Sequence, residues 1–127
     1  MILLDTSVVI ESFTGPQRLL PALRRTIQRG ERLALSSIVL YEWLRGPRLP
    51  EEINLQQRAF PEDSILPFGS GAAAVAAMLY RTVPRPRGRE ADLAIAACAI
   101  HHEAPLWTLN RADFRDIPGL VLFEADA

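Results

Sequence analysis

Short apolar runs alternate with helical patterns along the whole chain, and this alternation restricts the fold more than any other feature. The first run, ILLD at residues 2–5, is short and does not alternate between polar and apolar residues. Unbroken apolar runs of this length are typical of parallel strands that are covered on both faces. Strands that alternate with helices predict a three-layer α/β/α sandwich with a central, mainly parallel sheet and right-handed crossovers.

The boundaries of the predicted elements follow from periodicity and from residues that begin or end helices. Strands are predicted at residues 2–5, 32–37, 64–68, 104–110 and 120–125. Helices are predicted at residues 6–13, 16–29, 38–46, 51–60, 71–83 and 89–102. Thr6 or Ser7 is expected to cap the first helix, and Ser36 or Ser37 the third. An exposed loop is predicted at residues 84–89 (PRPRGR), and a turn or short helix at residues 111–116 (RADFRD).

The length and the cysteine count limit the organisation of the chain. A chain of 127 residues accommodates one domain, residues 1–127. The single cysteine, Cys98, excludes an internal disulfide and is expected to be a small buried apolar residue. The N-terminus has no basic stretch before its short apolar run, and no segment approaches the ~20 apolar residues of a membrane span. We therefore expect a cytoplasmic protein with no membrane segment.

The positive charge is carried by arginine alone. The net charge is −1, so bulk electrostatics does not indicate a nucleic-acid-binding protein. All 14 basic residues are arginine, and a cluster lies in and beside the loop at 84–89, namely Arg81, Arg85, Arg87 and Arg89. Arginine forks match phosphate oxygens well, so these side chains either contact a nucleic-acid backbone or simply form a solvated surface.

Four carboxylates fall where one edge of the predicted sheet would lie. Ligands of open parallel sheets bind beyond the carboxyl ends of the strands. Asp5 ends the first strand, and Asp113 follows strand 104–110 by a few residues. Asp92 lies in the first turn of its helix, and Glu42 lies near the middle of helix 38–46. We therefore expect carboxylates from four segments to gather at this edge.

Gathered carboxylates indicate a hard divalent cation. Like charges a few ångströms apart raise each other's pKa, and one group protonates unless a cation compensates. Oxygen ligands without histidine or cysteine favour Mg²⁺ or Mn²⁺ over zinc.

Each acid also has a simpler interpretation when taken alone. Asp5 and Asp113 suit helix caps or turns, Asp92 suits a helix N-terminus, and Glu42 suits a solvated helix face.

Hydroxyl and amide side chains are expected at the same edge. They are Thr6, Ser7, Thr108 and Asn110. Such groups either hold metal-bound water or the phosphate to be cut, or perform ordinary capping and turn functions. Both interpretations stay open at this point.

Four blocks of the sequence, taken in order, resemble the PIN-domain ribonucleases. Within that family the chain is similar to the toxins of VapBC-type toxin–antitoxin pairs. The blocks are LLDTSVVI, LSSIVLYEWLRG, EADLAIAACAI and LWTLNRADFRDIPGL. Each block is weakly specific, but the ordered set covers nearly the whole chain; only the stretch between Gly46 and Gly71 lacks a clear match.

The resemblance implies a function and assigns roles to residues. It implies Mg²⁺- or Mn²⁺-dependent hydrolysis of RNA phosphodiester bonds, a small VapB-type antitoxin as partner, and a homodimer. By position, the family's acidic metal-binding quartet corresponds to Asp5, Glu42, Asp92 and Asp113, and its two polar positions to Ser7 and Asn110. Glu90 and Asp116 are further acids near Asp92 and Asp113 with open roles. The arginines at 85, 87 and 89 are expected to follow the RNA backbone.

Other functions are compatible with parts of this pattern. A haloacid-dehalogenase-like phosphatase or a phosphorylated receiver module also has an aspartate after its first strand. The phosphatase expects a second aspartate where Ser7 stands, and both expect a lysine, which this chain lacks. A PIN-like protein that binds RNA or a partner without cutting, and a stand-alone RNA-processing nuclease, remain as alternatives to the toxin.

Overall fold

A four-stranded, entirely parallel sheet forms the centre of the computed structural model, which describes residues 1–125. The strand order is β3-β2-β1-β4. The strands are β1 (Ile2–Leu4), β2 (Leu33–Ser36), β3 (Ile65–Leu66) and β4 (Leu106–Trp107). Because β1 lies between β2 and β4, the residue that follows β1 emerges at the middle of the sheet's carboxyl edge.

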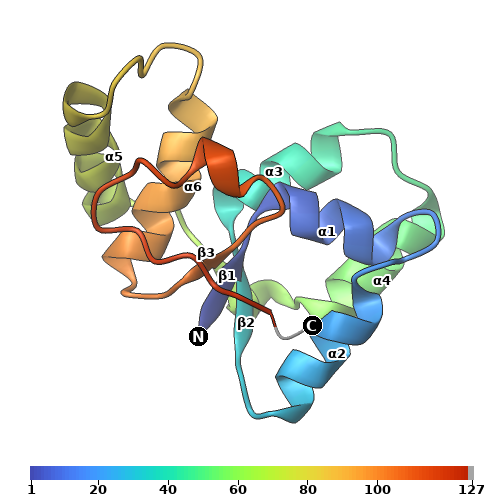
Figure 1. The fold of residues 1–127 in the computed structure, drawn as a ribbon. Helices are drawn as coiled ribbons and strands as arrows, with labels where there is room; N and C mark the ends of the chain where they lie inside the picture. The colour runs from blue at the N-terminus through green and yellow to red at the C-terminus, as the bar shows by residue number, and fades with distance from the viewer. Residues whose placement is uncertain (126–127) are drawn as a thin grey trace.

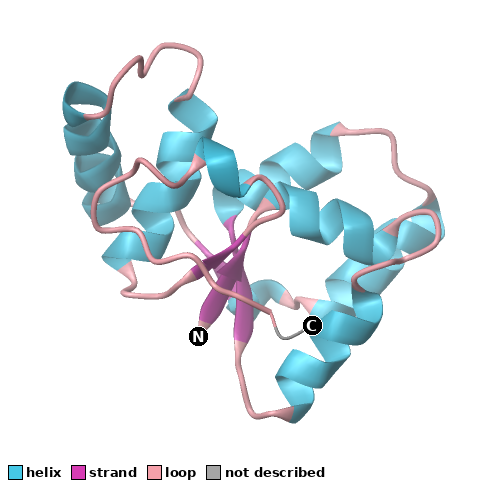
Figure 2. Ribbon diagram, viewed as in Figure 1, coloured by secondary structure: helices cyan, strands magenta, loops and turns pink. Residues whose placement is uncertain are grey.

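Helices cover both faces of this sheet (Figures 1 and 2). They are α1 (Thr6–Phe13), α2 (Leu20–Gln28), α3 (Ser37–Arg45), α4 (Pro50–Ala59), α5 (Ser70–Thr82) and α6 (Glu90–His101). Two short 3₁₀ turns are η1 (Glu62–Ser64) and η2 (Arg111–Asp113). In Figure 1, α5 and α6 lie on one side of the sheet, and α1, α2 and α4 lie on the other. The predicted three-layer architecture is therefore confirmed.

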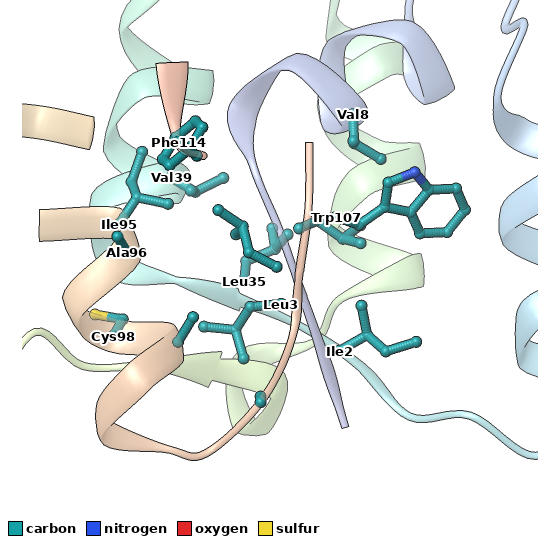
Figure 3. Packing of buried hydrophobic residues seen from close by; sticks show 14 of the residues in the cluster. Ile2, Leu3, Val8, Leu35, Val39, Ile95, Ala96, Cys98, Trp107 and Phe114 are labelled. Atoms are coloured by element: carbon teal, nitrogen blue, oxygen red, sulfur yellow. The ribbon is translucent and has the colours of Figure 1, made fainter. Parts of the chain in front are cut away.

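The core lies between the sheet and the helices on its two faces (Figure 3). Leu3 and Leu35 of neighbouring strands lie beside Ile95 and Cys98 of α6, and all four are buried. The prediction that Cys98 is a small buried residue is thus confirmed, and burial raises the pKa of its thiol to about 11. No helix in residues 1–125 combines the length and the apolarity that crossing a membrane requires.

Trp43 fixes helix α3 against the opposite side of the core. Its side chain is fully buried, and its Nε1 donates a hydrogen bond to Oε1 of buried Gln56 in α4 at 3.1 Å. Phe13 at the end of α1 contacts both Trp43 and Phe60 edge to face. These contacts join α1, α3 and α4, and α3 carries Glu42 beside the anchored indole.

Three details differ from the sequence-based predictions. The predicted strand at 120–125 is wrong, because only Leu122 forms an isolated parallel bridge, to Leu106. The helix predicted at 16–29 begins at Leu20, since Gly15 and Gln17 adopt positive φ angles of 53° and 54° that a right-handed helix excludes. Strands β3 and β4 are also shorter than predicted.

Of the two predicted capping sites, one is confirmed and one is wrong. Ser36 caps α3 by accepting a hydrogen bond from the Val39 backbone at 3.2 Å. Helix α1 already begins at Thr6, so neither Thr6 nor Ser7 is its cap. Asp5 occupies the cap position, but its carboxylate makes no capping hydrogen bond. The side chains of all three residues therefore remain available to the sheet edge.

Candidate active site

Asp5 lies at the carboxyl end of β1 and is only 4% exposed. Its backbone N–H donates to the Trp107 carbonyl at 2.8 Å, which fixes its position against β4. Its Oδ2 accepts hydrogen bonds from Ser7 Oγ at 2.9 Å and Thr108 Oγ1 at 2.7 Å. Among residues 1–125 no group donates to Oδ1, so one oxygen of the carboxylate has free acceptor capacity.

The two hydroxyl groups that hold Asp5 are themselves oriented by the loop after β4. The Leu109 backbone N–H donates to Ser7 Oγ at 3.1 Å, and the Asn110 backbone N–H donates to Thr108 Oγ1 at 3.0 Å. Each hydroxyl oxygen therefore accepts one hydrogen bond and gives its own proton to the Asp5 carboxylate. This arrangement holds the carboxylate in one orientation before any ligand binds.

Glu42 reaches the same edge from α3. Its Oε1 accepts a hydrogen bond from Thr6 Oγ1 at 2.6 Å, and its Oε2 lies 3.5 Å from the Arg45 guanidinium. Thr6 thus connects the beginning of α1 to α3 across 36 residues of sequence. The Glu42 side chain is partly buried, and Thr6 is its hydrogen-bond partner at the sheet edge.

Asp92 is the third carboxylate, in the first turn of α6. It is half-buried, and no donor among residues 1–125 forms a hydrogen bond with it. Burial raises the pKa of this carboxyl to about 6, and the charges of Asp5, Asp113 and Glu42 add to the rise, whereas Arg89 opposes it. A carboxylate that is repelled by three others and lacks a donor is a position where a cation is needed.

These groups line one surface hollow at the carboxyl edge of the sheet. It is lined by Asp5, Thr6, Ser7, Ile10, Glu42, Arg45, Asp92 and Asn110. Three of the four predicted acids and three of the four predicted hydroxyl and amide residues are therefore brought together. Thr108 is buried directly behind Asp5. Ile10 and Arg45 were missed, although the spacing of Arg45 three residues after Glu42 on a helix is a signal that could have found it.

Asp113 lies beside this hollow rather than in it. It ends the turn η2 and is exposed, and with Arg85 and Arg89 it lines a neighbouring hollow. Arg89 fastens this region, because its guanidinium donates to the Asp113 carbonyl at 3.0 Å and forms a two-pronged ion pair with Asp116 at 2.7 and 3.0 Å. The pair raises the pKa of Arg89 and lowers that of Asp116.

The remaining candidates lie outside the acidic hollow. Glu90 accepts a hydrogen bond from the Gly88 backbone at 3.1 Å, and the backbone N–H groups of Glu90 and Gly88 lower the pKa of this carboxyl. Glu90 and Asp116 thus have partners outside the acidic hollow. Arg85 and Arg87 lie exposed in the predicted loop, where Arg85 has a positive φ of 50°.

The donor set suits a cation that keeps most of its water. Within residues 1–125 no three His, Cys, Asp or Glu side chains lie close enough to enclose a metal ion by themselves. Mg²⁺ in phosphate-processing sites is commonly bound by one or two carboxylates, several waters and the substrate phosphate. Oδ1 of Asp5 and the carboxylate of Asp92, neither of which has a donor in the described part of the chain, match that requirement, so the residues fit a water-rich divalent ion.

The burial of the Asp92 carboxylate, together with repulsion from its acidic neighbours, should be visible in the stability of the metal-free protein. Folding raises this pKa to about 6 from 3.8, so the unfolded chain loses the proton at lower pH than the folded chain. Stability therefore falls as pH rises from about 4 to about 6, and the penalty is complete above that range. We expect Asp92→Asn to gain on the order of 1 kcal/mol at neutral pH, a value reduced for solvent screening, and nothing below about pH 4.

Urea denaturation in EDTA at a series of pH values measures this effect. Glu90→Gln is the matched control, because its carboxylate lies in the same helical turn but is fully exposed and accepts hydrogen bonds from backbone N–H groups. An Asp92→Asn variant that is less stable than the parent at neutral pH would show that burial and the neighbouring charges do not disfavour the ionised carboxylate.

Several solved structures are similar to this chain over nearly its whole length. It is similar to a chain of VapBC2 from Rickettsia felis bound to a promoter DNA fragment, with 24% identity, a TM-score of 0.77, and coverage of 99% of this chain and 100% of that one. It is similar to FitAcB from Neisseria gonorrhoeae, with 28% identity, a TM-score of 0.71, and coverage of 98% and 97%. A toxin–antitoxin complex from Klebsiella pneumoniae has 24% identity, a TM-score of 0.71, and coverage of 95% and 96%.

The family comparison covers almost the whole chain. Comparison with curated protein sequences finds no significant match. A model of the PIN domain family matches residues 2–120, a range that includes all four acids and the whole sheet. The resemblance seen in the four sequence blocks is thereby confirmed, and the chain belongs to the PIN-domain family of nucleases.

Proposed function

We propose that this protein is a metal-dependent endoribonuclease that hydrolyses RNA phosphodiester bonds as the toxin of a type II toxin–antitoxin pair. The observation that carries the proposal is the Asp92 carboxylate, which is half-buried, has no donor in residues 1–125, and is repelled by Asp5, Glu42 and Asp113. Mg²⁺ or Mn²⁺ would be held by Asp5 and Asp92, with Glu42 and Asp113 acting directly or through water. When bound, such an ion lowers the pKa of a water molecule and offsets charge on the phosphate oxygens.

The protein's own side chains would prepare the site for this reaction. Ser7 and Thr108 hold Asp5 through Oδ2, which leaves Oδ1 for the ion or its water. Thr6 holds Oε1 of Glu42 in the same way. Asn110 lines the hollow and offers an amide to the phosphate or to water. The exposed Arg85 and Arg87 would contact neighbouring phosphates, whereas Arg89 would support the loop through Asp116.

The proposed partner is a small VapB-type antitoxin. The Rickettsia felis structure contains VapBC2, and the Klebsiella pneumoniae structure is a toxin–antitoxin complex. A homodimer is part of the proposal as well, as the resemblance implies. The proposed location is the cytoplasm, where an RNA substrate and a small protein inhibitor would both be present. Co-purification with the product of an adjacent short reading frame, and the mass of the isolated chain by light scattering, test these assignments.

Cleavage of RNA by the purified chain is the direct test. We expect fragments of a structured RNA to appear with Mg²⁺ or Mn²⁺ and to disappear with EDTA, while small phosphate esters stay intact. The ion should also raise the melting temperature of the parental chain and leave that of an Asp5→Asn, Asp92→Asn double variant unchanged, because binding to the folded state alone stabilises it. Metal-independent cleavage, or retention of RNA without cleavage in either ion, would contradict the proposal.

A further inference from the structure

The acidic hollow contains one basic side chain, Arg45, among the residues that line it. Phosphate groups of a substrate would be repelled by Asp5, Glu42 and Asp92, so a basic group at this point favours their approach. The guanidinium of Arg45 lies 3.5 Å from Glu42 Oε2, yet its side chain remains 59% exposed. Most of its donors therefore face solvent and are available to a phosphate.

Other arginines near the site are more firmly engaged. Arg89 is held by Asp116 and by the Asp113 and Pro84 carbonyls. Arg48, three residues after Arg45, lies with its guanidinium carbon 4.3 Å from the Trp43 ring centroid and donates to the Trp43 carbonyl at 2.9 Å. Arg45 thus differs from both in combining a place in the acidic hollow with an accessible guanidinium.

Tyr41 stands beside Arg45 on the surface of α3. The guanidinium carbon of Arg45 lies 5.3 Å from the centre of the Tyr41 ring. The tyrosine is four residues earlier on the same helix, and it is 61% exposed. The Tyr41 ring and the Arg45 guanidinium therefore present an aromatic face and a charge side by side at the surface. Aromatic rings of this kind stack on unpaired nucleic-acid bases, and adjacent arginines bind the backbone.

We infer that Tyr41 and Arg45 form a nucleotide subsite at the rim of the acidic hollow, an inference that rests on the proposed function. Arg45 binds the phosphate next to the one that is cut, and the Tyr41 ring stacks on the attached base. A base can reach the ring only if it is not stacked within a duplex, so the subsite selects single-stranded RNA or a loop. The subsite supplies affinity beside the metal-binding carboxylates without belonging to them.

The experiment measures binding of a fluorescent single-stranded RNA by anisotropy at several salt concentrations. Asp92→Asn in EDTA serves as the background, so that cleavage is suppressed and the hollow is less negative. We expect Arg45→Gln to weaken binding and to make the logarithmic salt dependence shallower by about 0.7, the value for one phosphate contact on a single strand. Arg45→Lys should keep the salt dependence, because the charge remains.

Tyr41 is tested in the same assay. Tyr41→Leu should weaken binding by about fivefold or more, the lower end of one lost stacking interaction, and leave the salt dependence unchanged. Tyr41→Phe should bind like the background chain, because the ring remains. The matched control is Arg25→Gln. Arg25 is an exposed residue of α2, so this substitution removes the same charge at a position away from the hollow.

The outcomes separate this subsite from the proposed function. If Arg45→Gln leaves the salt dependence unchanged, or Tyr41→Leu binds no more weakly than Arg25→Gln, the subsite is wrong even when the parental chain cuts RNA. If both variants behave as expected but the parental chain cuts no RNA with Mg²⁺ or Mn²⁺, the subsite holds and the nuclease proposal fails.

Discussion

Asp5→Asn should reduce metal-dependent RNA cleavage by more than about a hundredfold while the protein stays folded. Substitution of a residue that only supports a metal ligand typically lowers metal affinity or activity by about 10- to 100-fold. Asp5 is proposed as the ligand itself, so its loss should be larger. The amide keeps the size of the side chain, and its oxygen can still accept hydrogen bonds from Ser7 and Thr108. The negative charge is lost, so affinity for the ion falls although the local geometry remains.

Initial cleavage rates at several Mg²⁺ concentrations, together with a denaturation curve for each variant, give the comparison. Asp113→Asn is the matched substitution, and we expect a smaller loss because Asp113 is exposed beside the hollow. An Asp5→Asn chain that cuts RNA at the parental rate would remove Asp5 from the site. Equal losses for both variants would mean that Asp113 binds the ion directly.

Trp43→Ala should destabilise the protein by about 3–5 kcal/mol, which is the usual cost of replacing a buried large aromatic residue by alanine. The indole is completely buried, contacts Phe13 edge to face, and lies beneath the guanidinium of Arg48. Its loss also leaves Oε1 of Gln56 without its donor, and Gln56 is only 2% exposed. A loss of this size is a large part of the 5–15 kcal/mol that typically stabilises a domain.

Urea denaturation followed by circular dichroism measures this loss. Trp43→Phe separates its two causes, because phenylalanine fills most of the space but cannot donate to Gln56. We expect Trp43→Phe to lose less stability than Trp43→Ala, with a remaining cost of about 1–3 kcal/mol for the unpaired amide oxygen. If the alanine variant unfolds at the parental urea concentration, α3 is not anchored by this residue.

The order of elements and the chemical type of the site could be predicted from sequence. Unbroken apolar runs that alternate with helical periods predicted a parallel sheet between two helical layers, because only covered strands tolerate such runs. The same topology predicted that the residues after the strands would lie at one edge. Asp5, Glu42 and Asp92 are found there, and Ser36 caps its helix as expected. These predictions worked because each depends on local pattern and on the general geometry of parallel sheets.

Element lengths and the partners of each side chain were decided by the tertiary structure. The segment 120–125 has an apolar pattern typical of a strand, but its pairing with the edge strand β4 is limited to Leu122. Asp113 and Asp116 are aspartates three residues apart, yet Arg89 binds the carboxylate of Asp116 and only the backbone carbonyl of Asp113. The sequence pattern could not distinguish them, since it does not contain the distance between segments.

The charged and polar residues of the site show the same difference between what the sequence predicts and what the tertiary structure decides. The sequence by itself determined that acids, hydroxyls and no lysine would accompany a parallel sheet. Only the folded chain determined that Thr6 donates to Glu42 and that Ser7 and Thr108 donate to one oxygen of Asp5. The fold also leaves Asp92 without a hydrogen-bond donor among residues 1–125. The physical reason is that local pattern selects secondary structure, whereas pKa values and hydrogen bonds depend on groups that become neighbours only when distant segments pack together.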